Sequence, residues 1–190
     1  MEEYPLERAW AVWYNGRAKR PPPRPGRPPP RGDEFTTPTR VGSFDTVSSL
    51  WRYMNNIAPP SELKQDVNLF IFQGATEPQW EHPDNKSGGR WTFSVDNSNA
   101  AAADTAWTVV YLALVGETLD PGFEIVGVTA SRRRHYIRIS VWTKDRKNDS
   151  AVLEIGHTLK RILAVPLGPG LKIEYQDHGA AFESYRHTLA

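Results

Sequence analysis

A tryptophan and a glutamate stand side by side at Trp80 and Glu81, in a stretch where regular structure is not expected. Residues 78–91 read PQWEHPDNKSGGRW, and prolines, an Asp-Asn pair and a Gly-Gly pair are typical of turns. We therefore expect both side chains on a connection between two strands, where ligand contacts concentrate. An indole can stack on a flat base, and a carboxylate can accept two N–H donors from guanine, whereas adenine presents an acceptor at N1. Taken alone, the dipeptide is better explained by a loop-packing tryptophan beside a solvated glutamate.

Basic residues gather at one later point of the chain, where Arg132, Arg133, Arg134 and His135 are followed by Arg138. Arginines of this kind suit the phosphates of a nucleotide. In a strand without a bulge, Arg138 would share a face with Arg132 and Arg134, and Arg133 would share the other with His135. A hairpin corner can break that alternation. On its own, a short charge run most often indicates a solvated turn.

Catalytic motifs do not accompany these residues. The sequence contains no Gly-x-x-x-x-Gly-Lys-Ser/Thr loop, no His-Glu-x-x-His and no Gly-x-Ser-x-Gly. It has no cysteine, and its five histidines show no metal-ligand spacing. A nucleotide hydrolase would need clustered carboxylates, and near Glu81 there are only His82 and Asp84. We expect a binding protein that is not an enzyme and uses no cofactor or metal.

Composition bounds the class of protein. With 190 residues the chain fits a single domain spanning 1–190. Its 23 basic and 22 acidic residues leave a net charge of +1, which argues against broad coating of nucleic acid and for a small, focused contact. The acidic start, Met1-Glu2-Glu3-Tyr4, is followed by no apolar run, so we expect no signal peptide, and no apolar stretch reaches the length of a membrane span. We expect no membrane partner and a cytoplasmic location, with the nucleus as a second possible compartment.

The elements that would position these residues follow from hydrophobic periodicity. Alternation over 8–14 puts Trp10 and Trp13 on opposite faces of a strand. A first helix is expected at 44–57 with Asp45 or Ser43 as its N-cap. Further strands are expected at 68–73, 90–95, 123–131, 134–142 and 172–176, and further helices at 100–116 and 149–163. This order predicts an α+β fold, with one antiparallel sheet, three helices on one face and the other face free for a ligand.

Two segments fall outside this pattern. Residues 17–31 are rich in proline and arginine, and we expect a flexible, extended loop at about 17–34. The Pro-x-x-Pro spacing from Pro22 to Pro25 and from Pro25 to Pro28 leaves open an interaction module for a domain with an aromatic groove. The tail at about 179–190 is expected to be mobile.

Six motifs in the same order resemble the eukaryotic translation initiation factor 4E family, which binds the 7-methylguanosine cap of messenger RNA. The resemblance covers roughly residues 4–178. The motifs are Tyr4-Pro5-Leu6 before Trp10-Ala11-Val12-Trp13; Phe44-Asp45-Thr46-Val47 before Trp51; Glu77-Pro78-Gln79-Trp80-Glu81 before Gly88-Gly89-Arg90-Trp91; Trp107 through Gly116-Glu117; Val141-Trp142-Thr143; and Tyr175-Gln176 with His178.

The resemblance implies a curved sheet with the helices on its convex face and a cap-binding slot on the concave side. It implies that Trp80 stacks on the methylated guanine, Glu81 accepts its edge, and Trp142 contacts the N7-methyl group. Arg133 then binds the triphosphate, together with His135 and Arg138 at two positions where the family has lysines.

The second aromatic face of the family's base sandwich is a tryptophan in the first loop. This chain has no tryptophan between Trp13 and Trp51, and Phe35 is the aromatic available in the aligned region. Tyr14, Phe182 and Tyr185 remain alternatives for covering the base.

A second surface is also implied by the resemblance. Trp51 would receive the Tyr-x-x-x-x-Leu helix of a 4G-type scaffold initiation factor or of a 4E-binding repressor, surrounded by Val47, Pro5, Leu6 and Leu112. Val109 stands where the family usually has a glutamate, and Thr108 where it has a leucine. The expected function is cap binding and partner binding in translation initiation. The alternative is a divergent relative that represses translation or sequesters messenger RNA.

Overall fold

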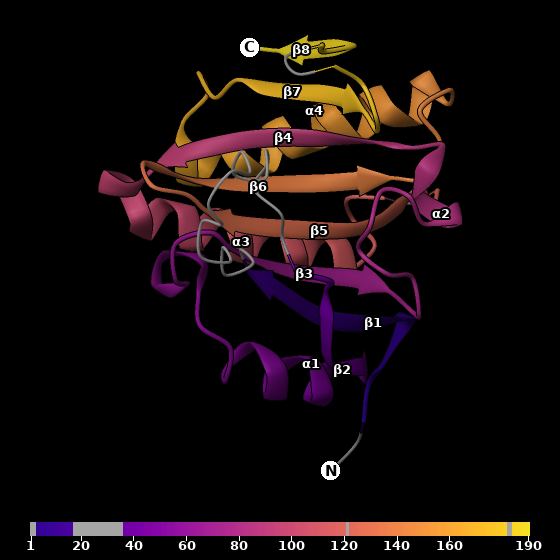
Figure 1. Ribbon diagram of the computed structural model, residues 1–190, viewed down its shortest axis with the longest axis vertical. Helices are drawn as coiled ribbons and strands as arrows, with labels where there is room; N and C mark the ends of the chain where they lie inside the picture. The colour runs from indigo at the N-terminus through magenta and orange to yellow at the C-terminus, as the bar shows by residue number, and fades with distance from the viewer. Residues whose placement is uncertain (1–2, 17–35, 121, 182–183) are drawn as a thin grey trace, which may run out of the picture.

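The computed structural model describes residues 3–16, 36–120, 122–181 and 184–190. Its described part forms one eight-stranded sheet in which every neighbouring pair is antiparallel, in the order β2-β1-β3-β5-β6-β4-β7-β8 (Figure 1). The strands are β1 (Pro5–Gly16), β2 (Thr39–Thr46), β3 (Val67–Gln73), β4 (Gly89–Asp96), β5 (Ile125–Arg132), β6 (Tyr136–Thr143), β7 (Ile173–Asp177) and β8 (His187–Leu189).

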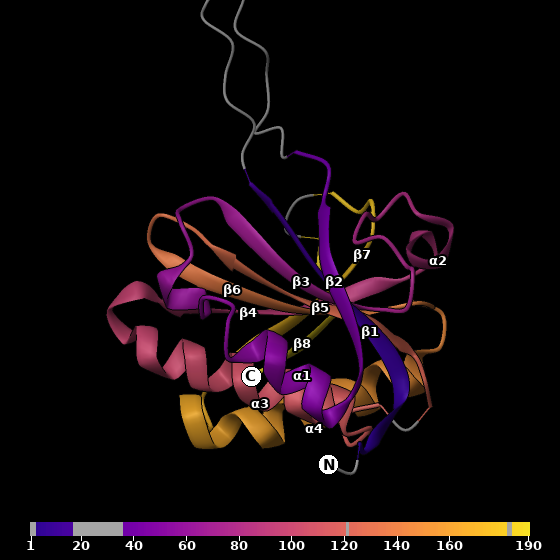
Figure 2. The same cartoon turned by 90° about the horizontal axis from the view of Figure 1, so that it is seen from below.

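Three helices cover one face of this sheet (Figure 2). They are α1 (Val47–Met54), α3 (Ala100–Val115) and α4 (Asp149–Leu167). A four-residue helix, α2 (Pro83–Lys86), lies instead in the connection between β3 and β4, and two 3-10 turns occupy Pro60–Glu62 and Asn97–Asn99. The predicted α+β fold, with one antiparallel sheet and helices on one face, is confirmed.

The main core lies between the sheet and the helices. Alternate strand residues such as Trp10, Ile71 and Trp91 pack there against Trp107 of α3 and Leu159 of α4. The side chains of the other parity point to the opposite face, which the helices leave open. Trp10 and Trp13 accordingly belong to different clusters, one in the main core and one on the open face, as the alternation predicts.

The turn after α3, residues 116–120, is joined to strand β1 by ion pairs and hydrogen bonds. Arg8 is buried and donates to both carboxylate oxygens of Glu117, at 2.9 and 2.5 Å, and its guanidinium lies 4.9 Å from the ring centroid of Trp10. Asp120 accepts from the backbone N–H groups of Glu124 and Ile125. A buried cation is tolerated only when paired, so this cluster fixes β1 against the start of β5.

The first predicted helix is wrong at both ends. Phe44 belongs to β2, where it lies opposite Trp10, and α1 begins only at Val47 and ends at Met54. The N-cap is neither Asp45 nor Ser43. Thr46 takes that role, in a capping box with Ser49.

Two edge strands were not expected from the sequence. The sequence assigns no element to residues 39–43 of β2 and places its residues 44–46 in the expected helix, and β8 lies in the segment expected to be a mobile tail. β8 pairs with β7, with His187 opposite Tyr175 and Leu189 opposite Ile173. Within the described residues, no helix is long and apolar enough to cross a membrane.

Candidate functional site

The strand register arranges the open face of the sheet in rows that cross the strands. The first row is apolar in its middle and runs Ala11, Phe72, Gly127, Trp142, Arg90, Gln176. The second runs Trp13, Phe70, Thr129, Ser140, Thr92, Glu174, and the third runs Asn15, Asn68, Ser131, Arg138, Ser94. The face therefore changes from aromatic to polar and cationic along the strands.

Trp142 is the centre of the apolar end. Its indole meets the ring of Phe72 edge-on, with centroids 5.3 Å apart. Between them lies Gly127, where a Cβ would come within 2.3 Å of the Phe72 ring, so this position admits no side chain. The indole is buried, yet its Nε1–H has no partner in the described structure.

Trp80 lies on the β3–β4 connection, as predicted, and about half of its surface is exposed (46 %). The loop is ordered from within by Asn85, whose buried side-chain amide donates to the carbonyls of Glu77 and Gln79 at 2.9 and 2.7 Å. Glu81 is exposed, and none of the described residues pairs with its carboxylate. The segment thus presents an indole and an available carboxylate next to each other.

Two consecutive residues link Trp80 to Trp142. The imidazole of His178 packs on the Trp142 indole with centroids 4.4 Å apart. At the next residue, Gly179, a Cβ would lie 3.6 Å from Cζ3 of Trp80. Since Trp80, Trp142 and residues 178–179 come from three separate parts of the chain, the fold brings the two tryptophans to one end of the open face.

Arg90 and Arg138 supply positive charge on the same face. Arg90 lies opposite Trp142 in the β4–β6 register and donates to Oε1 of Gln176 at 3.3 Å. Burial, and then repulsion from Arg138, hold the pKa of Arg90 below its usual range. Arg138 donates to the hydroxyl of Tyr136 at 3.0 Å, and its Nε–H is buried with no partner in the described structure. Two repelling cations on one surface favour an anionic ligand.

Arg133 reaches the open face from the β5–β6 turn. Its Nη2 donates to Oδ1 of Asn68 at 2.8 Å, and Asn68 donates to Asn15 at 2.6 Å. Arg133 and Arg138 therefore lie on one face, and the simple strand alternation that would separate them is broken at the hairpin corner, after Arg132.

His135 does not join these arginines in the described contacts. It is exposed on the turn, and its carbonyl accepts from the backbone N–H of Asn97. The pKa of Asp96 is lowered first by hydrogen bonds from Ser98 and also by the charge of His135.

Phe35 lies outside the described residues, as does the Pro/Arg-rich segment expected at 17–34. Thr36, the next described residue, is fixed to the end of β1. Its backbone N–H donates to the carbonyl of Gly16 at 2.9 Å, and its own carbonyl accepts from the Asn15 side chain at 3.0 Å.

Buried polar atoms without partners gather on this face. Among the described residues they include Nε1 of Trp13 and Trp142, Oγ1 of Thr129, Nε of Arg138, and Nε2 of His178 against Trp142. Buried polar groups are normally satisfied, so this concentration is typical of a surface that water or a ligand covers. No group of acidic, histidine or cysteine side chains in the described chain could hold a metal ion.

The predicted partner surface lies on the helix side. Trp51 of α1 is 40 % exposed and Val47 is exposed beside it. The backbone of Val47 bonds to the carbonyl of Tyr4, and Pro5 lies opposite Thr46 in the sheet, which puts the start of β1 next to α1. Leu6 and Leu112 are partly buried at the margin of the core.

Comparison with known proteins decides the family. The family model for eukaryotic initiation factor 4E matches residues 5–189, which is nearly the whole chain. The chain belongs to the eukaryotic initiation factor 4E family. Eukaryotic translation initiation factor 4E1 of Drosophila melanogaster is 35 % identical over 180 residues, covering 94 % of this chain and 64 % of the fly protein. The chain thus spans somewhat less than two thirds of that relative. Factor 4E-1 of Schizosaccharomyces pombe is 33 % identical over 178 residues, covering 93 % of this chain and 76 % of the yeast protein.

Solved structures of 4E factors share the fold. Ascaris suum eIF4E-3 in complex with an m7G cap gives a TM-score of 0.82 at 29 % identity, covering 99 % of this chain and 98 % of the other. Caenorhabditis elegans eIF4E-3 in complex with the 4E-binding protein Mextli and a cap analog gives 0.81 at 28 % identity, covering 99 % and 100 %.

The structure adds residues that sequence reasoning did not assign to the site. Arg90 could have been found, because Trp91 is a core residue and its neighbour on a strand must face the other way. The contacts of His178 and Gly179 could not have been found from the sequence, because they depend on how the segment after β7 returns over the sheet.

Proposed function

We propose that this 4E-family protein binds the 7-methylguanosine cap at the 5′ end of messenger RNA through the open face of its sheet. The observation that carries the proposal is the contact of consecutive residues His178 and Gly179 with Trp142 and Trp80. Two indoles at the apolar end of the face, with arginines on the same face, match a base linked to phosphates.

Each part of the cap has a counterpart. The exposed indole of Trp80 stacks on the base, and the carboxylate of Glu81 accepts N1–H and N2–H of guanine. Methylation at N7 makes the base cationic, so stacking on an indole gains cation–π attraction. Trp142 contacts the methyl group, and Arg133 and Arg138 bind the phosphates. Arg90 joins them because it lies opposite Trp142.

His135 contributes less than the two arginines. It is exposed on the turn, and within the described structure no hydrogen bond joins its imidazole to Arg133, Asn68 or Arg138. Phosphate binding at this corner then rests on the arginines, which stay charged at every physiological pH.

The test is a comparison of 7-methylguanosine triphosphate with GTP, which differ in one methyl group and one positive charge. Quenching of tryptophan fluorescence gives both dissociation constants. We expect the methylated nucleotide to bind at least about tenfold more tightly, since a desolvated cation–π contact contributes roughly 2 kcal/mol. Equal affinities would disprove the charged-base stack.

We further propose that the α1 surface around Trp51, Val47, Pro5, Leu6 and Leu112 binds a helix of a 4G-type scaffold factor or 4E-binding protein. The half-exposed indole of Trp51 supports this, because exposed aromatic anchors are typical of binding surfaces. The nematode relative was solved with such a 4E-binding protein. A pull-down with a 4E-binding peptide, with and without bound cap analog, tests whether the two surfaces act in one molecule.

A further inference from the structure

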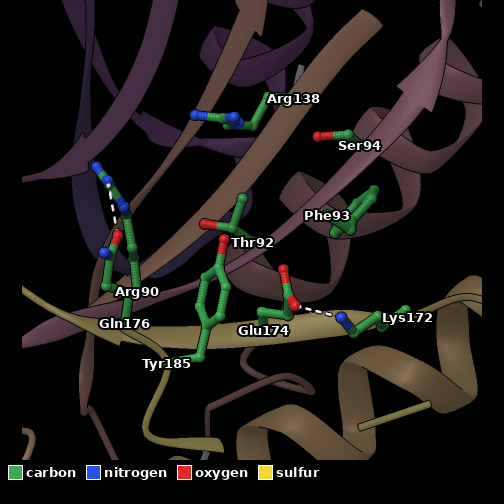
Figure 3. A pocket seen from close by; sticks show the side chains of 9 residues that line it. All are labelled: Arg90, Thr92, Phe93, Ser94, Arg138, Lys172, Glu174, Gln176 and Tyr185. Carbon is green, nitrogen blue, oxygen red and sulfur yellow. Dashed lines mark hydrogen bonds and ion pairs between the residues drawn. The ribbon is translucent and has the colours of Figure 1, made fainter. Parts of the chain in front are cut away.

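A second pocket lies on the open face, next to the proposed cap site. It has a volume of about 360 Å³, and Figure 3 shows the side chains around it. Its lining residues come from strands β4, β6 and β7, from the residue before β7 and from the segment before β8. They are Arg90, Thr92, Phe93, Ser94, Arg138, Lys172, Glu174, Gln176 and Tyr185. Arg90 both lines this pocket and lies opposite Trp142, so the pocket begins where the proposed cap site ends.

The lining combines three kinds of group. Arg90 and Arg138 bring cations whose guanidinium groups lie around the same space in Figure 3, and the buried Nε–H of Arg138 has no partner in the described structure. Tyr185 brings an aromatic ring that is 42 % exposed. Glu174 brings a carboxylate, held by Lys172 at 2.5 Å.

Tyr185 is held in place by its neighbour. The backbone N–H of Arg186 donates to the carbonyl of Tyr175 at 2.8 Å, and its guanidinium donates to both oxygens of Asp177, at 2.9 and 2.7 Å. The ring of Tyr185 extends from this anchored point toward Thr92 in Figure 3. Its place beside the sheet is therefore fixed by the short strand β8 and by Arg186.

We propose that this pocket binds the first nucleotide after the cap and prefers a guanine there. The proposal rests on the proposed cap-binding function, because the phosphate bridge of a bound cap would bring that nucleotide past Arg90 and Arg138. A free phosphate would not need the carboxylate of Glu174, which repels it. A nucleotide uses all three groups, with phosphate on the arginines, the base on Tyr185, and the base edge on Glu174.

The guanine preference follows from donors and acceptors. An ionised carboxylate only accepts hydrogen bonds, and guanine offers N1–H and N2–H together on one edge, whereas uracil offers a single N3–H. A purine also covers more of the Tyr185 ring than a pyrimidine does.

Affinities for three cap analogues test the proposal, namely 7-methylguanosine triphosphate and the dinucleotides m7GpppG and m7GpppU. We expect the wild-type protein to bind m7GpppG about threefold or more tightly than m7GpppU. Tyr185→Ala should weaken m7GpppG about five- to tenfold and leave 7-methylguanosine triphosphate within about twofold, because the lost stacking concerns the second base alone. Tyr185→Phe should keep wild-type affinity, and Glu174→Gln should bring the ratio of m7GpppG to m7GpppU affinity close to one.

Tyr4→Ala is the matched control, since Tyr4 is an exposed tyrosine just before β1 that does not line the pocket. Thermal melting shows whether Tyr185→Ala keeps the fold. A wild-type protein that binds no methylated nucleotide would overturn the proposed function itself. If 7-methylguanosine triphosphate binds but Tyr185→Ala weakens all three analogues equally, or none of them, the cap site stands and the second pocket is disproved.

Discussion

The imidazole of His178 packs on the indole of Trp142 with ring centroids 4.4 Å apart, in a site where its Nε2 has no partner among the described residues. Burial is the main reason that the pKa of His178 falls from 6.5 to about 3, and the nearby charges of Arg90 and Arg146 lower it further. The folded protein therefore keeps this histidine neutral where an unfolded chain would bind a proton.

This difference makes the stability depend on pH. The pKa of His178 is lower in the folded protein than in the unfolded chain, so above pH 6.5 this histidine takes nothing from the free energy of unfolding. The free energy of unfolding decreases as the pH falls from 6.5 toward 3, because the unfolded chain then binds a proton that the folded protein does not. We expect His178 to remove about 2 kcal/mol from the free energy of unfolding between pH 7 and pH 5. Urea unfolding of wild type and of His178→Gln at both pH values measures this loss as the difference between the two proteins. Exposed His157→Gln should behave as wild type, and equal losses in wild type and His178→Gln would contradict the prediction.

Periodicity predicted the elements that are buried on at least one side. Trp10 and Trp13 divide between the two faces of β1 because alternation is a property of any strand, whatever surrounds it. Periodicity predicts the wrong element for Phe44, since its spacing to Val47 and Trp51 also fits a helix. Its place in β2 depends on tertiary packing, where a Cβ on Gly42 would clash with the Tyr53 hydroxyl. Strand β8 has three residues and exists only through its pairing with β7, which no local pattern reports.

The candidate site, like the fold, could be predicted in part from the sequence. Turn residues predict a loop for Trp80 and Glu81, and the family motifs in the sequence single out Trp142. The hairpin corner that turns Arg133 toward Asn68 changes the strand alternation locally, and sequence alone could not decide its direction.

Glu81→Ala tests the edge of the base. We expect this change to weaken binding of 7-methylguanosine triphosphate by roughly 1.5 to 3 kcal/mol, since the lost hydrogen bonds are charge-assisted. Isothermal titration calorimetry gives the difference directly. Glu77→Ala is a suitable control, because Glu77 is exposed on the same loop and its backbone carbonyl, which the change keeps, holds Asn85, while its side chain accepts only an exposed bond from Gln79. Wild-type affinity in Glu81→Ala would show that another group reads the guanine edge.

Arg133→Ala tests the phosphate site. The variant should lose about 1.5 to 3 kcal/mol of binding energy for 7-methylguanosine triphosphate and almost none for the 7-methylguanosine nucleoside, which carries no phosphate for the arginine to meet. Fluorescence titration with the two ligands separates these outcomes. Exposed Arg134→Ala serves as the control on the same turn. If the two ligands lose affinity alike, Arg133 supports the loop through Asn68 and does not bind phosphate.

Trp51→Ala tests the partner surface separately from the cap site. Loss of an aromatic anchor at an interface typically costs 2 kcal/mol or more, so affinity for a Tyr-x-x-x-x-Leu peptide should fall about 30-fold. Affinity for the methylated nucleotide should not change, because α1 lies on the other face of the sheet. Val165→Ala, on the exposed end of α4, is the control. Unchanged peptide binding would place the partner elsewhere.

Phe35 is the last residue to test, and it decides what completes the base sandwich. The described residue that follows it, Thr36, is bonded to Gly16 and Asn15 at the end of β1, where Asn15 lies opposite Asn68. If Phe35 covers the second face of the base, Phe35→Ala should weaken cap binding by roughly 1 to 3 kcal/mol. Phe35→Trp should keep or raise the affinity, because an indole offers a larger and more electron-rich face to a cationic base.

The rival to Phe35 is a ring from the C-terminal segment, Phe182 or Tyr185, because Tyr14 lies opposite Leu69 and shares the helix side of β1 with Trp10. Under that arrangement Phe35→Ala would leave the affinity unchanged and Phe35→Trp would not help. Phe182→Ala and Tyr185→Ala would then identify the ring, since loss of the ring that stacks on the base must lower affinity for 7-methylguanosine triphosphate itself. Tyr185 at that position would also contradict its role in the second pocket, where its loss affects only the dinucleotide caps. The same titrations therefore assign one aromatic to each base.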